Sequence, residues 1–213
     1  MRIALDEIEP RIWRRVEVPL GMSLKGPHDV IQAAMGWEGY HLYEFQVGDK
    51  RYGVPDPEWD DMRRVLSAKS TKLASLIERG VRKLGYVYDF GDDWRHTITV
   101  EVVAAADPGT EYPRFVEGMR RGPPEDVGGI DGYYEFLEAM ASLRHQEHKR
   151  MRDWYGGLYD PEDIDAPVIA SRISQLARRR TLGRAAYEKS KGRAHSTTKI
   201  GVLRSSSLSL PRY

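Results

Sequence analysis

Two short segments of the chain concentrate the residue types that do chemistry. Three carboxylates and an imidazole within eight residues can bind a divalent cation or transfer protons. In the first segment, Tyr88 to His96 (YDFGDDWRH), the candidate residues are Asp89, Asp92, Asp93, Trp94 and His96. The acids also suit an ordinary tight turn, because Gly91 tolerates positive φ and aspartate side chains accept hydrogen bonds from backbone N–H groups. Turn formation is the interpretation that we favour.

The second segment, Gly122 to Leu137, reads GPPEDVGGIDGYYEFL and adds the candidates Glu125 and Asp126. Its glycines allow another element to approach the backbone closely. We therefore expect the two segments to meet in space and form one acidic site. Whether His96 lies near Asp89 depends on the register of the hairpin, which the residue pattern leaves open. A divalent metal is the only cofactor that the sequence suggests.

Histidines outside these segments are weaker candidates for metal ligands. A lone histidine such as His28 or His41 is more often hydrogen-bonded and partly buried than a metal ligand. His145 and His148 are three residues apart and would share a helix face, where they can bind a metal together with Glu147. Two ligands do not make a site, so we interpret that face as solvated and polar.

The elements that position the two segments follow from hydrophobic periodicity. Apolar residues alternate before Asp89 and after Trp94, which predicts two strands joined as a hairpin with an acidic tip. Residues 53–70 read as a loop. Arg14 falls on the apolar side of a predicted strand, where it is either an edge residue or an internal ion-pair partner; the head of such a side chain usually reaches solvent. The other predicted strands are Arg11–Pro19, Tyr43–Val47, Arg51–Val54 and Tyr112–Met119, and the predicted helices are Pro27–Gly36, Thr71–Gly80, Ile130–Ala141, His145–Trp154 and one that begins at Asp165.

This order of elements predicts an α+β fold with a mixed, mostly antiparallel sheet and with helices gathered in the C-terminal half. The 213 residues are 40% hydrophobic and 31% charged, as in a soluble globular protein. No apolar run approaches the roughly 20 residues of a membrane-spanning helix, so we expect no membrane partner. The chain has no cysteine, which excludes a thiol nucleophile and is compatible with the cytoplasm, where we expect the protein.

Charge is distributed unevenly along the chain. Residues 171–213 hold 11 lysines and arginines against the single acid Glu188, whereas residues 1–170 hold 22 basic and 31 acidic residues. We expect a folded domain at residues 1–177 and a disordered basic tail at residues 178–213. Such a tail can bind nucleic acid through its phosphates. The candidate contacts are Arg178, Arg179, Arg180, Arg184, Lys189, Lys191 and Arg193.

Five segments in a fixed order resemble the Ri-plasmid open-reading-frame-three-like family, some of whose members are labelled passenger TnpR-like proteins of insertion elements. The segments are RIWRRVEVP (11–19), IQAAMGWEGYHLYEF (31–45), YDFGDDWRH (88–96), PPEDVGG (123–129) and YGGLYDPEDID (155–165). The resemblance covers residues 2–177 and implies a small α+β protein associated with plasmids and mobile elements. It implies no reaction.

Two hypotheses about function survive. Recombinase catalysis is disfavoured, because Ser23 lacks the activating arginines of a serine recombinase and no tyrosine-recombinase set is found. The favoured hypothesis is a non-enzymatic accessory or binding module with a basic tail. The alternative is a metal-dependent hydrolase or nuclease that uses Asp89, Asp92, Asp93 and His96, together with Glu125 and Asp126.

Overall fold

Several strands of the protein have one face turned inward, as their alternating burial shows. In β2 and β7, for example, every second side chain is buried. The structure, a computed structural model, describes residues 1–56 and 64–196, with side chains described as far as Lys191. The strands are β1 (Arg2–Leu5), β2 (Trp13–Glu17), β3 (Tyr43–Val47), β4 (Lys50–Gly53), β5 (Val65–Ser67), β6 (Lys83–Tyr88), β7 (Trp94–Thr99) and β8 (Arg114–Met119).

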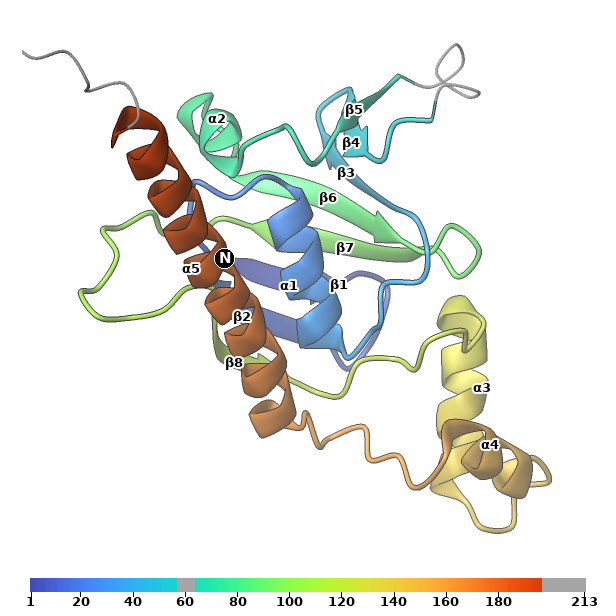
Figure 1. The fold of residues 1–213 in the computed structure, drawn as a ribbon. Helices are drawn as coiled ribbons and strands as arrows, with labels where there is room; N and C mark the ends of the chain where they lie inside the picture. Colours follow the sequence, from blue (N-terminus) through green and yellow to red (C-terminus); the bar gives the residue numbers. More distant parts are fainter. Residues whose placement is uncertain (57–63, 197–213) are drawn as a thin grey trace, which may run out of the picture. The chain divides into compact units, whose positions relative to one another are not determined.

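These strands form one mixed sheet in the order β5-β4-β3-β6-β7-β1-β2-β8 (Figure 1). Every neighbouring pair is antiparallel except β4 and β5, which are parallel. The predicted hairpin is confirmed: β6 and β7 pair from Lys83 opposite Thr99 to Tyr88 opposite Trp94. Its turn is the acidic segment, which therefore lies at one end of the two central strands. The strand β5 lies in the stretch that the sequence predicts as loop, and it is only three residues long.

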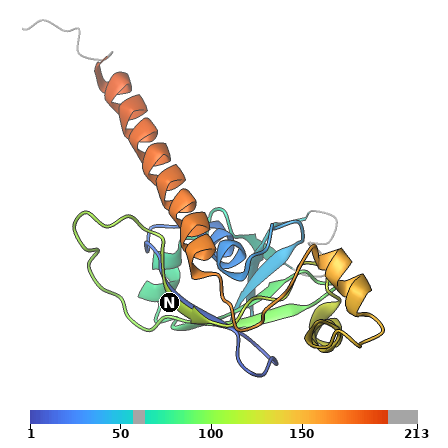
Figure 2. The ribbon, with the colours of Figure 1, turned by 90° about the horizontal axis from the view of Figure 1, so that it is seen from below.

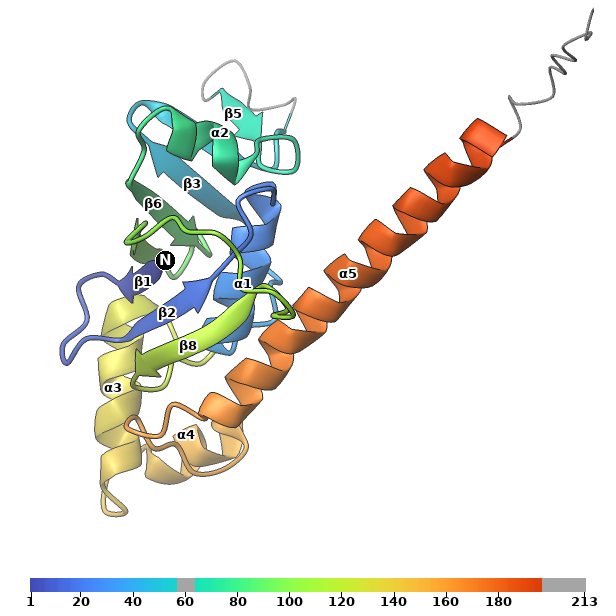
Figure 3. The same cartoon turned by 90° about the vertical axis from the view of Figure 1, so that its left-hand side faces the viewer.

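Helix α1 lies across one face of the sheet (Figures 1 and 3). Pro27 falls in the first turn of this helix. Gly36 caps the C-terminal end of the helix in the left-handed conformation, with φ 92°. The helices are α1 (Lys25–Met35), α2 (Leu73–Glu78), α3 (Gly129–Ala141), α4 (His148–Tyr155) and α5 (Ala166–Ser196). Three of the five follow β8, so the fold is α+β with helices mostly in the C-terminal half, as predicted.

The core between the sheet and the helices is rich in aromatic side chains. Trp37 follows α1 and stacks on Tyr88 with ring centroids 5.0 Å apart. Helix α3 adds Tyr133 and Phe136, which are fully buried. Figure 2 shows α3 and α4 together at one end of the sheet, beside the turn of the acidic hairpin. The second acidic segment leads directly into α3, so the core itself fixes where that segment lies.

Arg14 differs from the expectation for its side chain. Its head does not reach solvent; the residue is only 1% exposed. Because α1 covers this part of the sheet, Arg14 Nε donates a hydrogen bond to the Ala34 carbonyl at 2.7 Å. Arg14 is not an ion-pair partner either, since no carboxylate of the described residues lies within 4.0 Å of it.

The chain divides into two units, Met1–Ala177 and Arg178–Tyr213. Within the second unit, residues 178–196 continue α5 where the composition predicts disorder. Alanine, leucine, arginine and lysine are strong helix formers, which explains the difference. The prediction for residues 197–213 lies outside the described residues. In the part of the chain that the structure describes, no helix has the length and apolar character needed to cross a membrane.

Candidate functional site

The turn between β6 and β7 is built by its own aspartates. Asp89 has a φ of 55° and Asp93 a φ of 56°, values that few residues other than glycine adopt readily. Asp89 Oδ1 accepts a hydrogen bond from the Gly91 N–H at 2.9 Å, and the Asp93 N–H donates to the Asp89 carbonyl. Turn formation therefore uses one oxygen of the Asp89 carboxylate and leaves Oδ2 available.

The two acidic segments meet. Asp92 Oδ2 accepts a hydrogen bond from the Gly128 N–H at 3.2 Å. Gly129 has a φ of 70°, and a Cβ at this position would lie 2.8 Å from the Asp92 carbonyl oxygen. Only glycine allows this close approach without displacing backbone. The glycines of the second segment thus hold it against the hairpin turn.

A histidine outside both segments joins one acid from each of them. His41 Nε2 lies 2.8 Å from Asp126 Oδ1 and 3.5 Å from Asp89 Oδ2. One ligand atom from each of the three side chains lies within 4.8 Å of the others. We call these residues the His41–Asp89–Asp126 triad. It combines one imidazole nitrogen with two carboxylate oxygens, a donor set that suits zinc or manganese.

The backbone holds the triad in place at a conformational cost. Asp126, like Asp89, has positive φ, at 56°. Non-glycine residues in this region are strained, and such strain collects at ligand-binding and catalytic sites. The Asp89 side chain is 11% exposed and the Asp126 side chain 64%, so the triad is closed on the hairpin side and open on the other.

Glu125 lies beside the triad and is held by other groups. Its Oε1 accepts hydrogen bonds from the Tyr88 hydroxyl at 2.6 Å and from the Glu38 N–H at 3.3 Å. Burial, followed by the Glu125 carboxylate, raises the pKa of Tyr88 well above its usual range. The phenol therefore stays protonated and keeps donating to Glu125, which fixes the segment that carries Asp126.

The remaining sequence candidates lie elsewhere. Asp93 pairs with Arg95 at 2.8 Å, and Trp94 is a core residue, 1% exposed, whose ring meets the edge of Tyr133. His96 is also buried: its Nδ1 lies 3.1 Å from the Trp94 carbonyl oxygen, and its Nε2 has no partner among the described residues. Neither nitrogen contacts a carboxylate, so the register of the hairpin separates His96 from the acids.

The pairing of β3 with β6 explains why His41, which was expected only to be hydrogen-bonded and partly buried, lies beside Asp89. Tyr43 is opposite Tyr88, and the Asp89 N–H donates to the Leu42 carbonyl. The segment just before β3, which contains His41, therefore lies beside the hairpin turn. This antiparallel pairing could not be derived from local residue patterns. The only sequence signal was that His41 falls inside one of the five characteristic segments. The expectation that His145 and His148 share a solvated helix face is wrong: α4 begins at His148, which is buried with its Nδ1 2.9 Å from the Ala139 carbonyl oxygen.

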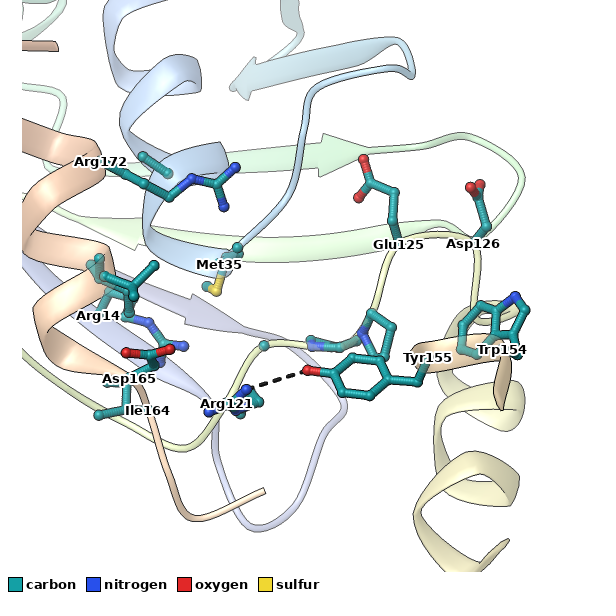
Figure 4. A pocket seen from close by; sticks show the side chains of 17 residues that line it. Arg14, Met35, Arg121, Glu125, Asp126, Trp154, Tyr155, Ile164, Asp165 and Arg172 are labelled. Carbon is teal, nitrogen blue, oxygen red and sulfur yellow. Dashed lines mark hydrogen bonds between the residues drawn. The ribbon is translucent and has the colours of Figure 1, made fainter. Parts of the chain in front are cut away.

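A cavity of about 480 Å³ adjoins the triad (Figure 4). Glu125 and Asp126 line one end of it, and the side chains of Arg14, Arg121 and Arg172 line the rest together with apolar groups. Its volume is in the range of small-molecule sites, which run from roughly 300 to 1,000 Å³. Asp126 belongs both to the triad and to the cavity wall, whereas His41 and Asp89 are not among the lining residues.

Comparisons with known proteins agree with the fold and the motifs. An uncharacterised protein, y4hQ, of Sinorhizobium fredii is 42% identical over 177 residues, which cover 83% of this chain and 87% of that protein. The crystal structure of a protein of unknown function from Methanosarcina mazei Go1 superposes with a TM-score of 0.71 at 33% identity, covering 78% of this chain and 93% of that chain. The family model described as plasmid pRiA4b ORF-3-like protein matches residues 1–167. The chain therefore belongs to the plasmid pRiA4b ORF-3-like family.

Proposed function

We propose that the protein is a divalent-metal-dependent hydrolase whose metal is held by His41, Asp89 and Asp126. The observation that carries this proposal is the convergence of three ligand atoms from three separate segments within 4.8 Å. Ligands that share one ion at bond lengths near 2.1 Å lie about 3 to 4 Å apart, so small side-chain shifts accommodate an ion. Zinc and manganese both accept imidazole together with carboxylates.

Water activation is the chemistry that such a centre supplies. Three protein ligands leave coordination positions open, and a bound divalent ion lowers the pKa of water so that hydroxide forms near neutral pH. Asp126, the most exposed side chain of the triad, also lines the cavity. Tyr88 and Glu125 have a positioning role, because their hydrogen bond fixes the residue before Asp126.

The test is calorimetric titration of zinc and manganese into the full chain, followed by assays on p-nitrophenyl acetate, p-nitrophenyl phosphate and bis-p-nitrophenyl phosphate. We expect His41→Gln and Asp89→Asn to lose metal binding and turnover. Asp93→Asn is the matched control, because Asp93 lies in the same turn with the same positive φ but outside the triad. Absence of binding heat in the parent would refute the metal site. Binding without turnover of any ester would refute the hydrolase and leave a metal-binding accessory module.

Nucleic-acid binding by the second unit is a second candidate function. Every described side chain from Arg178 to Lys191 is exposed, and Glu188 is the only acid among these residues. Basic residues on an exposed helix bind nucleic-acid phosphates with an affinity that falls as salt rises. The relevant residues are Arg178, Arg179, Arg180, Arg184, Lys189 and Lys191; the side chain of Arg193 lies outside the described ones.

Fluorescence anisotropy with a labelled DNA duplex at about 50 mM and about 200 mM salt tests this candidate. We expect the full chain to bind the duplex at low salt, and we expect its affinity for the duplex to fall as the salt concentration rises. Changing the six basic residues to glutamine should abolish binding and leave metal affinity unchanged. Equal affinity of the parent and the substituted chain at low salt would exclude these residues as the nucleic-acid site.

A further inference from the structure

Arg14 is a buried cation that forms no ion pair with any carboxylate of the described residues. It is 1% exposed, and its three hydrogen bonds go to neutral carbonyl oxygens: Nε to Ala34, and Nη1 to Trp13 and Met119. Among the described residues, Nη2 donates to no group, and no carboxylate lies within 4.0 Å of the guanidinium. Burial lowers the pKa of Arg14 to about 10, which still leaves it charged at neutral pH. Burying a charge without a partner is costly, so Arg14 points to an anion from outside the chain.

The cavity beside the triad is where such an anion can bind. Arg14 lines it from β2, Arg121 from the segment after β8, and Arg172 from α5 (Figure 4). Arg121 pairs with Asp163 at 2.9 Å, and Arg172 pairs with Glu38. Those two guanidiniums already have carboxylate partners, whereas Arg14 does not.

The acids of the cavity wall do not offset the charge of Arg14. Asp126 belongs to the triad, and Glu125 accepts the Tyr88 hydroxyl. Asp165 also lines the cavity, yet it forms no ion pair with Arg14 within 4.0 Å. A metal at the triad would neutralise the acidic end, and at the other end Asp165 is the one lining acid beside the guanidiniums of Arg14, Arg121 and Arg172.

We propose that this cavity binds the phosphate group of a small phosphate monoester, with Arg14, Arg121 and Arg172 as the anion-binding residues. Guanidinium groups match the geometry of phosphate oxygens, and three of them around one cavity suit a group with several terminal oxygens. A cavity volume of about 480 Å³ is large enough for a small molecule but too small for a folded protein. Binding of the anion stands independently, whereas the reaction below rests on the proposed function.

The reaction follows from the position of Asp126 in both sites. A metal held by the triad would supply hydroxide from water, and this hydroxide would form a bond to phosphorus as the bond between phosphorus and the alcohol oxygen breaks. The alcohol oxygen takes a proton, so one water molecule is consumed and the products are the alcohol and inorganic phosphate. The guanidiniums stabilise the negative charge on the phosphoryl oxygens during this transfer.

The test is calorimetric titration of inorganic phosphate into the full chain without metal. Val168→Trp fills the cavity from its half-exposed wall, and Arg172→Gln removes one anion-binding group. Val116→Trp and Arg114→Gln are matched controls, because Val116 is similarly exposed and Arg114 also pairs with a glutamate, both outside the cavity. We expect phosphate to bind the parent and both controls alike, and to bind the two cavity variants about tenfold or more weakly.

Several results would overturn the proposal. These are an absence of phosphate binding in the parent, unchanged affinity in Val168→Trp, and acetate or citrate binding more tightly than phosphate. Zinc titration of the same samples separates the two proposals. Zinc binding without phosphate binding refutes only the anion site, whereas phosphate binding without zinc binding refutes the metal centre and leaves the anion site.

Discussion

Acidification should destabilise the protein because two of its histidines are buried in neutral form. Burial lowers the pKa of both His96 and His28 to about 3. In the unfolded chain a histidine has a pKa of about 6.5. Below that pH the unfolded chain takes up protons on these histidines, whereas the folded protein does not. The free energy of unfolding is therefore highest above pH 6.5 and declines as the pH falls toward 3.

The size of the effect follows from the linkage relation. Between pH 6 and pH 5 each histidine should cost about 1.2 kcal/mol of unfolding free energy, and the two together about 2.4 kcal/mol. Replacing His96 with phenylalanine keeps an aromatic ring against Trp37 and removes one of the two titrating groups. The variant should therefore lose only about half as much stability over the same interval.

Urea denaturation at pH 6 and pH 5, followed by tryptophan fluorescence, measures both quantities. His145→Gln is the control variant, because it removes an exposed histidine in place of a buried one. The reasoning is refuted if the parent is equally stable at the two pH values. It is also refuted if His96→Phe retains the full pH dependence of the parent.

Three further predictions concern the core and the site. Phe136→Ala should lower the free energy of unfolding by about 3 to 5 kcal/mol, measured by urea denaturation, because the ring is fully buried. Gly129→Ala should lower both stability and zinc affinity, measured by urea denaturation and calorimetry, because its Cβ would meet the Asp92 carbonyl; Gly157→Ala, with nothing within 4 Å of its Cβ, should do neither. Zinc at 100 times its dissociation constant should stabilise the parent by about 2.7 kcal/mol and raise its Tm by several degrees, and His41→Gln should show no such rise in a thermal melt.

Local patterns predicted most elements of this fold but not β1 or β5, whereas tertiary contacts decided the site. Alternating residues on both sides of the acidic turn were sufficient to predict β6 and β7, and helical spacing of apolar residues predicted α3. His41 is hydrogen-bonded and partly buried, as expected, but its partners could not be predicted, and the burial of Arg14 was misjudged; both depend on a neighbour distant in sequence. Pairing of β3 with β6 brings His41 to Asp89, and coverage by α1 buries Arg14. A short strand such as β5 carries too few residues for an alternation to be recognised.

The acidic segments illustrate how much of a candidate site a sequence can reveal. The expectation that they meet was correct, because their glycines permit the contact between Gly129 and Asp92. The expectation that His96 is the imidazole of the site has no support in the geometry, since its ring lies in the core. One acid from each segment remains, and His41 takes the place that His96 was expected to fill.

Anomalous diffraction at the zinc edge, from crystals of the full chain grown with zinc, tests the central claim most directly. The account predicts one strong peak about 2.0 to 2.2 Å from His41 Nε2 and from a carboxylate oxygen of Asp89 and of Asp126. A zinc-grown crystal with no peak at these atoms, and with His41 still hydrogen-bonded to Asp126, would contradict it.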